Sequence, residues 1–286
     1  MNPLVYHIAS GQSFFTGIAL MLAGAILSQW PQRTCHRIAV LLMIVAALAI
    51  VLSSTAISYW FYVLAIAGSL PWVLSGFRQD WQHWAPHCLM AGWLFAAAAE
   101  VPYHALPTLR PVSSRSVTVL GDSMTAGVGG SDKAETWPKL LAREHQLTVQ
   151  NISHVGETAA SALKRVKQQG VDAELVLIEI GGNDLLGSTT AAEFDRDLQA
   201  LLANLAAPNR QLVMFELPLP PFYHEYGRVQ RAAAARHQVA LVPKRVLLSI
   251  LAGGDSTLDT IHLSQAGHQR MADTAWGLLQ PAFASE

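Results

Sequence analysis

Four short segments of this chain carry residue types that could together perform acyl transfer through a serine. They are Gly121-Asp122-Ser123, Gly156, Gly181-Gly182-Asn183-Asp184 and Asp259-Thr260-Ile261-His262. A serine hydroxyl is a poor nucleophile until a base takes its proton, and histidine, which titrates near neutral pH, is a suitable base. One Gly-Asp-Ser is common by chance. All four segments in this order, each after a strand-like run, indicate one catalytic site.

The spacing of these residues predicts the role of each. Asp259 stands three residues before His262, so one tight turn can bring its carboxylate to the ring nitrogen that faces away from Ser123. The N–H of Gly156, the side-chain NH2 of Asn183 and the amide of Ser123 itself can stabilise the oxyanion of a tetrahedral intermediate, at about 2.7–4 kcal/mol per donor. We therefore predict Ser123, His262 and Asp259 as the catalytic residues, and Ser123, Gly156 and Asn183 as the oxyanion hole.

Three further acidic residues lie close to these segments in the sequence. Asp122 and Asp184 are predicted to be structural, because each can accept backbone amides within its own loop. Glu179 stands inside an apolar run, where a buried carboxyl group needs a hydrogen-bond partner.

The elements that must position this site are predicted from the alternation of two patterns. Segments with helical periodicity separate short apolar runs, which cover residues 116–120, 147–152, 175–180, 211–217 and 239–242. Apolar strands that alternate with helices predict a parallel sheet covered on both faces. Ligands of such sheets bind beyond the carboxyl ends of the strands, which is where Gly121, Gly156 and Gly181 fall.

The first 106 residues have a different composition. Their only charged side chains are Arg33, Arg37, Arg78, Asp80 and Glu100. Apolar stretches at about 8–29, 38–54, 57–77 and 86–104 predict about four transmembrane helices, of which the fourth is the least clear, since about 20 apolar residues cross the 30 Å hydrocarbon core. We predict a membrane region over residues 1–106 and a second domain over residues 107–286.

The arginines predict the orientation of these helices. Arg33 and Arg37 separate the first two stretches, and Arg78 separates the last two, so the positive-inside rule places both loops in the cytoplasm. With four spans, the second domain would lie outside the cytoplasm, in the periplasm of a bacterium whose inner membrane holds the helices. The connector, residues 102–115, reaches at most about 50 Å.

Composition also limits the partners. The net charge of −1 argues against nucleic acid, which needs a basic surface. Cys35 and Cys88 are the only cysteines, and no Cys/His cluster has the spacing of metal ligands. We expect neither a metal nor an organic cofactor.

From residue 116 to about 282 the chain resembles the SGNH hydrolases, also called the GDSL family, and is most similar to their bacterial thioesterase, lysophospholipase and arylesterase branch. The matching segments are Gly121-Asp122-Ser123-Met124-Thr125, Asn151-Ile152-Ser153, Gly156-Glu157-Thr158, Gly181-Gly182-Asn183-Asp184, Asp259-Thr260-Ile261-His262-Leu263-Ser264 and Gly267-His268. The resemblance implies a three-layer, flavodoxin-like α/β/α fold with about five parallel strands. It also implies the roles assigned above to Ser123, Gly156, Asn183, Asp259 and His262.

The substrate is indicated less directly. Leu185 and Leu186 follow the oxyanion asparagine, and Phe222 and Tyr223 end an apolar segment after the fourth strand-like run. These four side chains are predicted to bind substrate, and they suit an acyl chain or aryl ester better than a phosphate or a sugar. The expected function is a membrane-anchored serine esterase. The alternatives are an O-acetyl esterase or acyltransferase acting on envelope polysaccharide, or a membrane interaction module.

Overall fold

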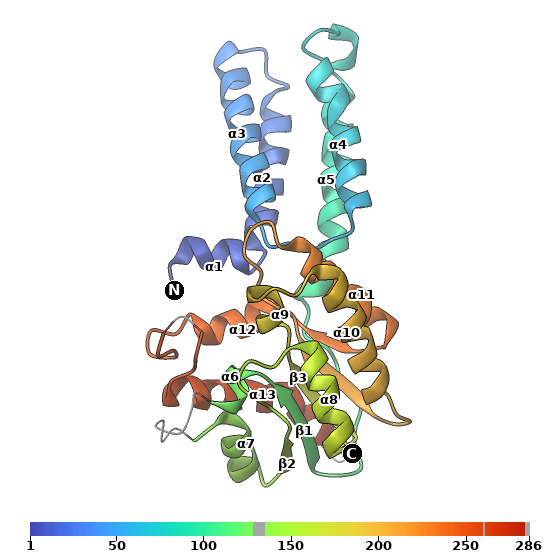
Figure 1. Cartoon of the computed structure of the whole chain (residues 1–286). Coiled ribbons are helices and arrows are strands. Elements are labelled where there is room, and N and C mark those ends of the chain that lie inside the picture. Colours follow the sequence, from blue (N-terminus) through green and yellow to red (C-terminus); the bar gives the residue numbers. More distant parts are fainter. Residues whose placement is uncertain (128–134, 260, 284–286) are drawn as a thin grey trace. The chain divides into compact units, whose positions relative to one another are not determined.

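The computed structural model describes residues 1–127, 135–259 and 261–283 (Figure 1). By its contacts the chain divides into two units. The sheet unit comprises Ala105–Pro218 and Glu225–Glu286, together with Met1–Asn2, and the helical unit comprises Pro3–His104 and Leu219–His224. Both units are therefore built from separate segments of the sequence.

The sheet unit is built on five parallel strands in the order β2-β1-β3-β4-β5. The strands are β1 (Ser116–Gly121), β2 (Thr148–Asn151), β3 (Leu175–Glu179), β4 (Gln211–Phe215) and β5 (Ala240–Val242). This result confirms the predicted α/β fold with about five parallel strands. The runs of Val, Ile and Leu were reliable guides because β1, β3 and β4 are buried on both faces.

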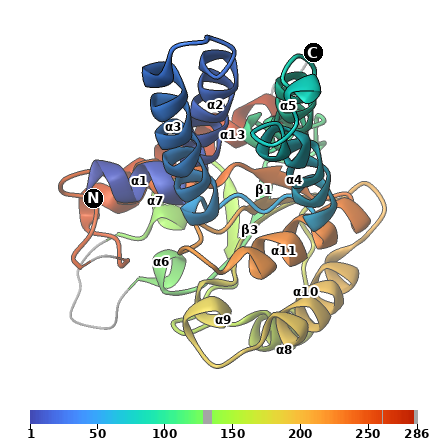
Figure 2. The ribbon, with the colours of Figure 1, turned by 90° about the horizontal axis from the view of Figure 1, so that it is seen from above.

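Helices cover both faces of this sheet. They are α6 (Ser123–Ala126), α7 (Trp137–His145), α8 (Ala159–Gln169), α9 (Gly182–Leu186), α10 (Ala191–Leu205), α11 (His224–Arg236), α12 (Lys244–Leu251) and α13 (Gln265–Phe283). Alternate residues of the strands, such as Val117 and Val119, share one core with α7, α12 and α13. In Figure 2, α8, α10 and α11 lie together on one side of β1 and β3. Thr158 and Thr190 begin α8 and α10 with capping boxes.

The helical unit contains α1 (Pro3–Ala9), α2 (Gln12–Leu27), α3 (Arg33–Leu52), α4 (Tyr59–Leu74) and α5 (Ala85–Glu100), with short 3₁₀ turns at Gln79–Trp81 and Val101–His104. α2 packs on α3, α4 packs on α5, and α2 also contacts α5. Small residues allow these close approaches. A Cβ on Gly17 would lie 2.8 Å from the carbonyl oxygen of Ala46, and one on Gly68 would lie 2.8 Å from that of Cys88.

Helix length does not support the prediction of about four transmembrane helices. Within the described residues only α3, with 20 residues, is long and apolar enough to cross a bilayer alone. α2, α4 and α5 have 16 residues each, and a span needs about 20. α1 and α2 meet at 87°, so the predicted first stretch is a bent pair that counts at most as a second candidate.

Two local features explain why hydropathy overestimated these helices. Gly11, just before α2, has a φ of +83°, a left-handed conformation that ends the run of α1. Residues 53–58 lie outside any helix, so the end of the predicted stretch 38–54 and the start of the stretch 57–77 are not helical. Hydropathy measures apolarity over a window, and it does not report where the backbone leaves the helical conformation.

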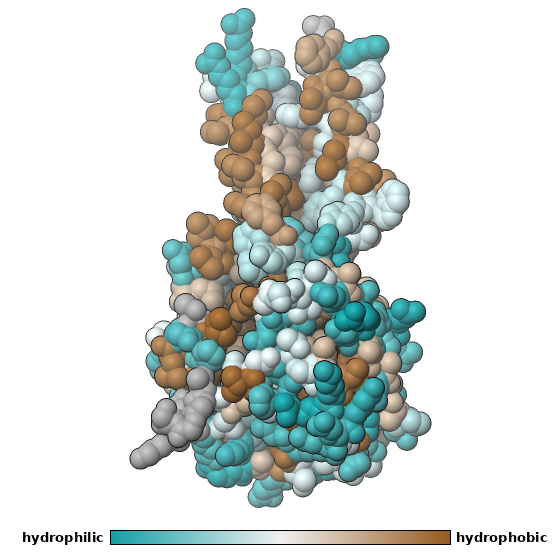
Figure 3. Space-filling model, viewed as in Figure 1, coloured by the Kyte–Doolittle hydropathy of each residue, from teal (hydrophilic) through white to brown (hydrophobic). Residues whose placement is uncertain are grey.

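The surface of α3 and α4 is strongly apolar (Figure 3). On α3 the exposed large side chains are Val40, Leu41, Ile44, Val45, Leu48 and Val51. Only 17% of the most apolar 18-residue window of α3 is buried. α3 is therefore unlike the core helix of a water-soluble protein, which buries most of its apolar residues.

Candidate active site

Ser123 lies just beyond the carboxyl end of β1, a strand that has a neighbour on each side. It follows the turn at the end of β1 and begins the short helix α6, and only 8% of its surface is exposed. The preceding Asp122 caps this helix, because its Oδ1 accepts the N–H of Met124 at 2.9 Å. Gly121 is required before the turn, since a Cβ there would lie 2.2 Å from Oγ1 of Thr125. The serine is thus held on a tight turn where the sheet binds ligands.

Asp259 and His262 form a hydrogen-bonded pair in the loop before α13. Nδ1 of His262 lies 2.7 Å from Oδ2 of Asp259. The other oxygen, Oδ1, accepts the N–H groups of Ile261 at 2.7 Å and His262 at 2.8 Å. The hydrogen bond from His262, followed by the two backbone amides, lowers the pKa of Asp259 below its ordinary range. An ionised carboxylate only accepts, so Nδ1 carries the hydrogen and Nε2 is left as a base.

Asn183 connects three loops at the carboxyl edge of the sheet. It stands in α9, after Gly181, whose φ is +114°. Its Nδ2 donates to Oδ2 of Asp122 at 3.0 Å and to the carbonyl oxygen of Glu157 at 3.1 Å. The side-chain amide is therefore oriented by the loops that follow β1 and β2. Both of its hydrogens are engaged, so an oxyanion must compete with one of these acceptors.

Gly156 lies in the loop between β2 and α8 and has a φ of +77°. A Cβ built on it would meet no atom within 4 Å, so its surroundings are open. The next residue, Glu157, is buried and forms an ion pair with Arg165 at 2.6 Å. The open space beside a left-handed glycine, next to a residue fixed by an ion pair, suits an amide that must approach a substrate oxygen.

Three buried carboxyl groups surround this region. Burial raises the pKa of Asp122 and also raises the pKa of Glu179 well above its usual range. Burial raises the pKa of Asp184 to about 6, and its Oδ2 accepts the N–H of Ala159 at 3.0 Å. Asp122 thus accepts an amide of its own loop, as predicted, whereas Asp184 accepts one from the start of α8.

The sequence indicated only that Glu179 needs a partner. In the structure the partner is the Ser123 turn, because Oε2 of Glu179 accepts the N–H of Asp122 at 3.3 Å and the hydroxyl of Thr125 at 3.0 Å. The positive charge of protonated His262 also lowers the pKa of Asp122. His262 is therefore close enough to act electrostatically on the residue next to Ser123.

The four predicted substrate-binding residues are placed differently from one another. Both leucines belong to α9, but the side chain of Leu185 is buried, whereas 64% of Leu186 is exposed. Phe222 and Tyr223 are also exposed, and Phe222 has a φ of +73°. Both belong to the segment Leu219–His224, which groups with the helical unit. In that unit Nε2 of His224 lies 2.6 Å from the carbonyl oxygen of Ser53.

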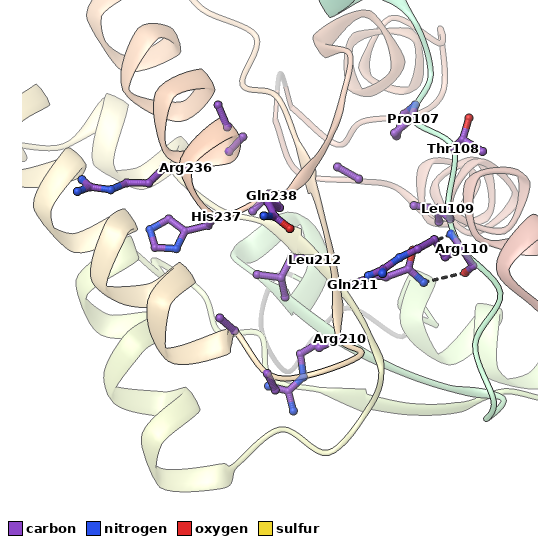
Figure 4. A pocket seen from close by; sticks show the side chains of 16 residues that line it. Pro107, Thr108, Leu109, Arg110, Arg210, Gln211, Leu212, Arg236, His237 and Gln238 are labelled. Atoms are coloured by element: carbon purple, nitrogen blue, oxygen red, sulfur yellow. Dashed lines mark hydrogen bonds between the residues drawn. The ribbon is translucent and has the colours of Figure 1, made fainter.

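A pocket of about 790 Å³ lies at the opposite end of the sheet unit, where β4 and β5 begin (Figure 4). Arg210 lines it, but its guanidinium donates to the carbonyl oxygens of Ala173, Leu205 and Val171, and so holds loop ends together. Gln211 exchanges two hydrogen bonds of 2.7 Å with the backbone of Arg110. The pocket faces the amino ends of the strands, away from the edge that carries Ser123.

The fold and the site define a serine ester hydrolase of the α/β class. The chain belongs to the GDSL-like Lipase/Acylhydrolase family, which it matches over residues 119–270, more than half of its length. This finding confirms the resemblance seen in the sequence motifs.

Relatives and a solved structure agree with this assignment. The chain is 30% identical to "Esterase TesA" of Pseudomonas aeruginosa over 59% of this chain and 90% of that protein. It is 33% identical to "Thioesterase 1/protease 1/lysophospholipase L1" of Escherichia coli K12, over 43% of this chain and 59% of that protein. The crystal structure of TesA superposes with a TM-score of 0.51 at 29% identity, covering 59% of this chain and 99% of that one.

Proposed function

We propose that this protein is a membrane-embedded serine esterase that hydrolyses lipid-like acyl esters through Ser123, His262 and Asp259. The observation that carries the proposal is the 2.7 Å hydrogen bond between His262 and Asp259, in a family member whose Ser123 follows the carboxyl end of β1. That bond fixes the imidazole tautomer with Nε2 available as the base, which a serine hydroxyl needs to react.

The reaction proceeds in two acyl transfers. Oγ of Ser123 attacks the ester carbonyl while Nε2 of His262 takes its proton, and Asp259 stabilises the resulting imidazolium. Collapse of the tetrahedral intermediate breaks the ester C–O bond, and the imidazolium returns the proton to the leaving alcohol. Water, deprotonated by His262, then attacks the acyl-enzyme and releases the acid and the free serine.

The oxyanion of both intermediates accepts hydrogen bonds from the N–H groups of Ser123 and Gly156 and from Nδ2 of Asn183. The open space at Gly156 supports this assignment, since the substrate oxygen needs room beside the backbone. For Asn183, the oxyanion replaces or shares one of its two present acceptors, Asp122 and Glu157. A developing negative charge is a stronger acceptor than a backbone carbonyl oxygen, which favours the exchange.

Lipid-like substrates are supported by two features. Leu186 presents an exposed apolar side chain three residues after Asn183. The relative from Escherichia coli carries lysophospholipase and thioesterase in its name, and both classes of substrate have acyl chains. Leu185 is buried, whereas Phe222 and Tyr223 are exposed apolar side chains of the helical unit.

A chain-length profile tests the substrate class. The full-length protein, in detergent and in liposomes, should prefer longer p-nitrophenyl acyl esters and lysophospholipid over acetyl esters. Each buried methylene is worth about 0.8 kcal/mol, so kcat/KM should rise up to about fourfold per carbon until the binding site is filled. A preference for acetyl esters with no turnover of lipid would contradict the lipid proposal and favour deacetylation of envelope polysaccharide. A product carrying the acyl group on a second envelope molecule would identify an acyltransferase.

The membrane proposal rests on the helical unit. α3 is long enough to span, its apolar side chains are exposed, and glycines mediate close contacts between helices, as is typical of membrane proteins. Two indole N–H groups are satisfied within the unit, because Trp72 donates to Ser28 and Trp93 donates to Ser69, both at 3.0 Å. We propose that the unit lies in the bacterial inner membrane, with the sheet unit in the periplasm.

Reporter fusions test this topology. In the helical unit the α2–α3 and α4–α5 connections lie at the same end (Figure 1). Arg33 begins α3 directly after the first connection and Arg78 lies in the second, so the positive-inside rule makes that end cytoplasmic. Alkaline phosphatase fused after Glu286 should be active in a Gram-negative host, and a fusion at Arg37 should be inactive. The reverse pattern would contradict a periplasmic catalytic domain. Replacing the helices with one unrelated anchor tests whether they do more than tether.

A further inference from the structure

Glu179 is the one carboxyl group of β3 that reaches under the turn carrying Ser123. It ends the strand, is paired in register with Gly121 of β1, and is only 3% exposed. Oε2 accepts the N–H of Asp122 and the hydroxyl of Thr125, so Glu179 contacts residues on both sides of the nucleophile. Gly121 packs closely against this same oxygen, since a Cβ at this position would lie 3.1 Å from it and 2.2 Å from Oγ1 of Thr125.

Asp122 transmits this contact to the oxyanion asparagine. Its Oδ1 accepts the N–H of Met124, and its Oδ2 accepts a hydrogen from Nδ2 of Asn183 at 3.0 Å. A Cβ on Gly182 would approach Oδ2 to 3.1 Å, so α9 packs directly against this carboxylate. One chain of contacts therefore runs from Glu179 through Asp122 to Asn183.

We propose that Glu179 is a positioning residue of this site: as a neutral acid it donates its proton to Asp122, and so holds the Ser123 turn and the Asn183 amide in the geometry that binds the oxyanion. The inference rests on the proposed roles of Ser123 and Asn183. It assigns no contact between Glu179 and the substrate.

The chemistry of two adjacent carboxyl groups requires this proton. The buried carboxyl groups of Glu179 and Asp122 are neighbours, because Glu179 accepts the backbone N–H of Asp122, and two such groups can share a hydrogen bond only when one of them is protonated. Glu179 is the acid of the pair, since burial and the charge of Asp122 both raise its pKa. Asp122 is the anion, because Met124 and Asn183 donate hydrogens to it.

The shared proton also serves the oxyanion. A bare carboxylate at Asp122 would repel the negative charge that develops beside Asn183, and it would hold the amide hydrogen that the oxyanion needs. A proton donated by Glu179 draws charge away from Asp122 and weakens both effects. The other titratable groups that interact with Asp122 are Glu157, from the loop before α8, His262, from the loop before α13, and Asp184, from α9.

Two substitutions of Glu179 test whether catalysis depends on its hydrogen bonds or only on the volume of its side chain. Glu179→Gln keeps an acceptor for Thr125 and supplies an N–H donor to Asp122, so its kcat should stay within about twofold of wild type. Glu179→Met keeps the volume but removes both functions. Its kcat should fall about 10- to 100-fold with KM nearly unchanged, as expected when an oxyanion donor is displaced by a fraction of an ångström. The assay uses the full-length protein and p-nitrophenyl butyrate.

Glu174→Met is the matched control. Glu174 stands just before the other end of β3, where it accepts the N–H and hydroxyl of Ser113. This variant should lower the thermal unfolding midpoint without changing kcat. Infrared difference spectra of wild type minus Glu179→Gln should also show the C=O band of a protonated acid at neutral pH, a measurement that does not depend on the folding of Glu179→Met.

Three results would overturn the inference: a kcat for Glu179→Met close to wild type, an equal loss in Glu179→Gln, or absence of the acid band. In each case a fluorophosphonate that still labels Ser123 in the wild type leaves the proposed function intact. Absence of labelling at Ser123 in the wild type would instead refute the proposed function, and the role of Glu179 with it.

Discussion

Replacing Ser123 by alanine should abolish ester hydrolysis while leaving the protein folded. The substitution removes only one oxygen, at a residue that is 8% exposed on a turn held by Asp122 and Glu179, so the supporting hydrogen bonds remain. Without Oγ no acyl-enzyme forms, and kcat should fall by roughly 10⁶. His262→Ala should be nearly as severe, because the nucleophile and its base act as a unit and their losses do not add.

Two measurements check this result. Steady-state hydrolysis of p-nitrophenyl esters gives the loss of kcat, and a fluorophosphonate should label the wild type but not Ser123→Ala. Ser249→Ala is the control, since the hydroxyl of Ser249 on α12 donates to the carbonyl oxygen of Val246 within the same helix. Labelling that persists on another residue of Ser123→Ala would identify a different nucleophile.

Asn183→Ala should lower kcat by about 10²–10³ and change KM little. The NH2 group is needed mainly when the carbonyl oxygen becomes an oxyanion, and loss of one such donor costs about 2.7–4 kcal/mol in the transition state. The variant also loses contacts with Asp122 and Glu157, so a smaller decrease in stability should accompany the loss of activity.

The stability effect can be separated from the catalytic one with a second asparagine. Asn209 lies in the turn before β4 and has a φ of +64°, so Asn209→Ala should lower the unfolding midpoint and leave kcat unchanged. A change in KM alone for Asn183→Ala would make this residue a ground-state binding group and would leave the oxyanion without its side-chain donor.

The sequence predicted the sheet well, for physical reasons. Strands buried on both faces must be apolar along their whole length, so the runs before Gly121 and Gly181 could be recognised without any tertiary information. The pair Asp259 and His262 is local, since three residues of chain bring the carboxylate to the ring. A contact between two residues this close in sequence depends only on the conformation of the backbone between them.

What the sequence could not predict depends on neighbours in space. The link from Glu179 to the Ser123 turn follows from the register of β3 against β1, which no local pattern specifies. The difference in exposure between Leu185 and Leu186 depends on how α9 packs. Helix ends in the first 106 residues depend on backbone conformation at Gly11 and at residues 53–58, which an average over an apolar stretch does not report.

The grouping of Leu219–His224 with the helical unit has a consequence for modularity. The chain enters and leaves that unit twice, so no single peptide bond separates the two units. A fragment starting at residue 107 would carry this segment without its neighbours in the helical unit, including Ser53, the partner of His224. Exchange of the N-terminal helices between relatives must therefore include the β4–α11 connection, and the two parts of the gene should evolve together rather than recombine freely.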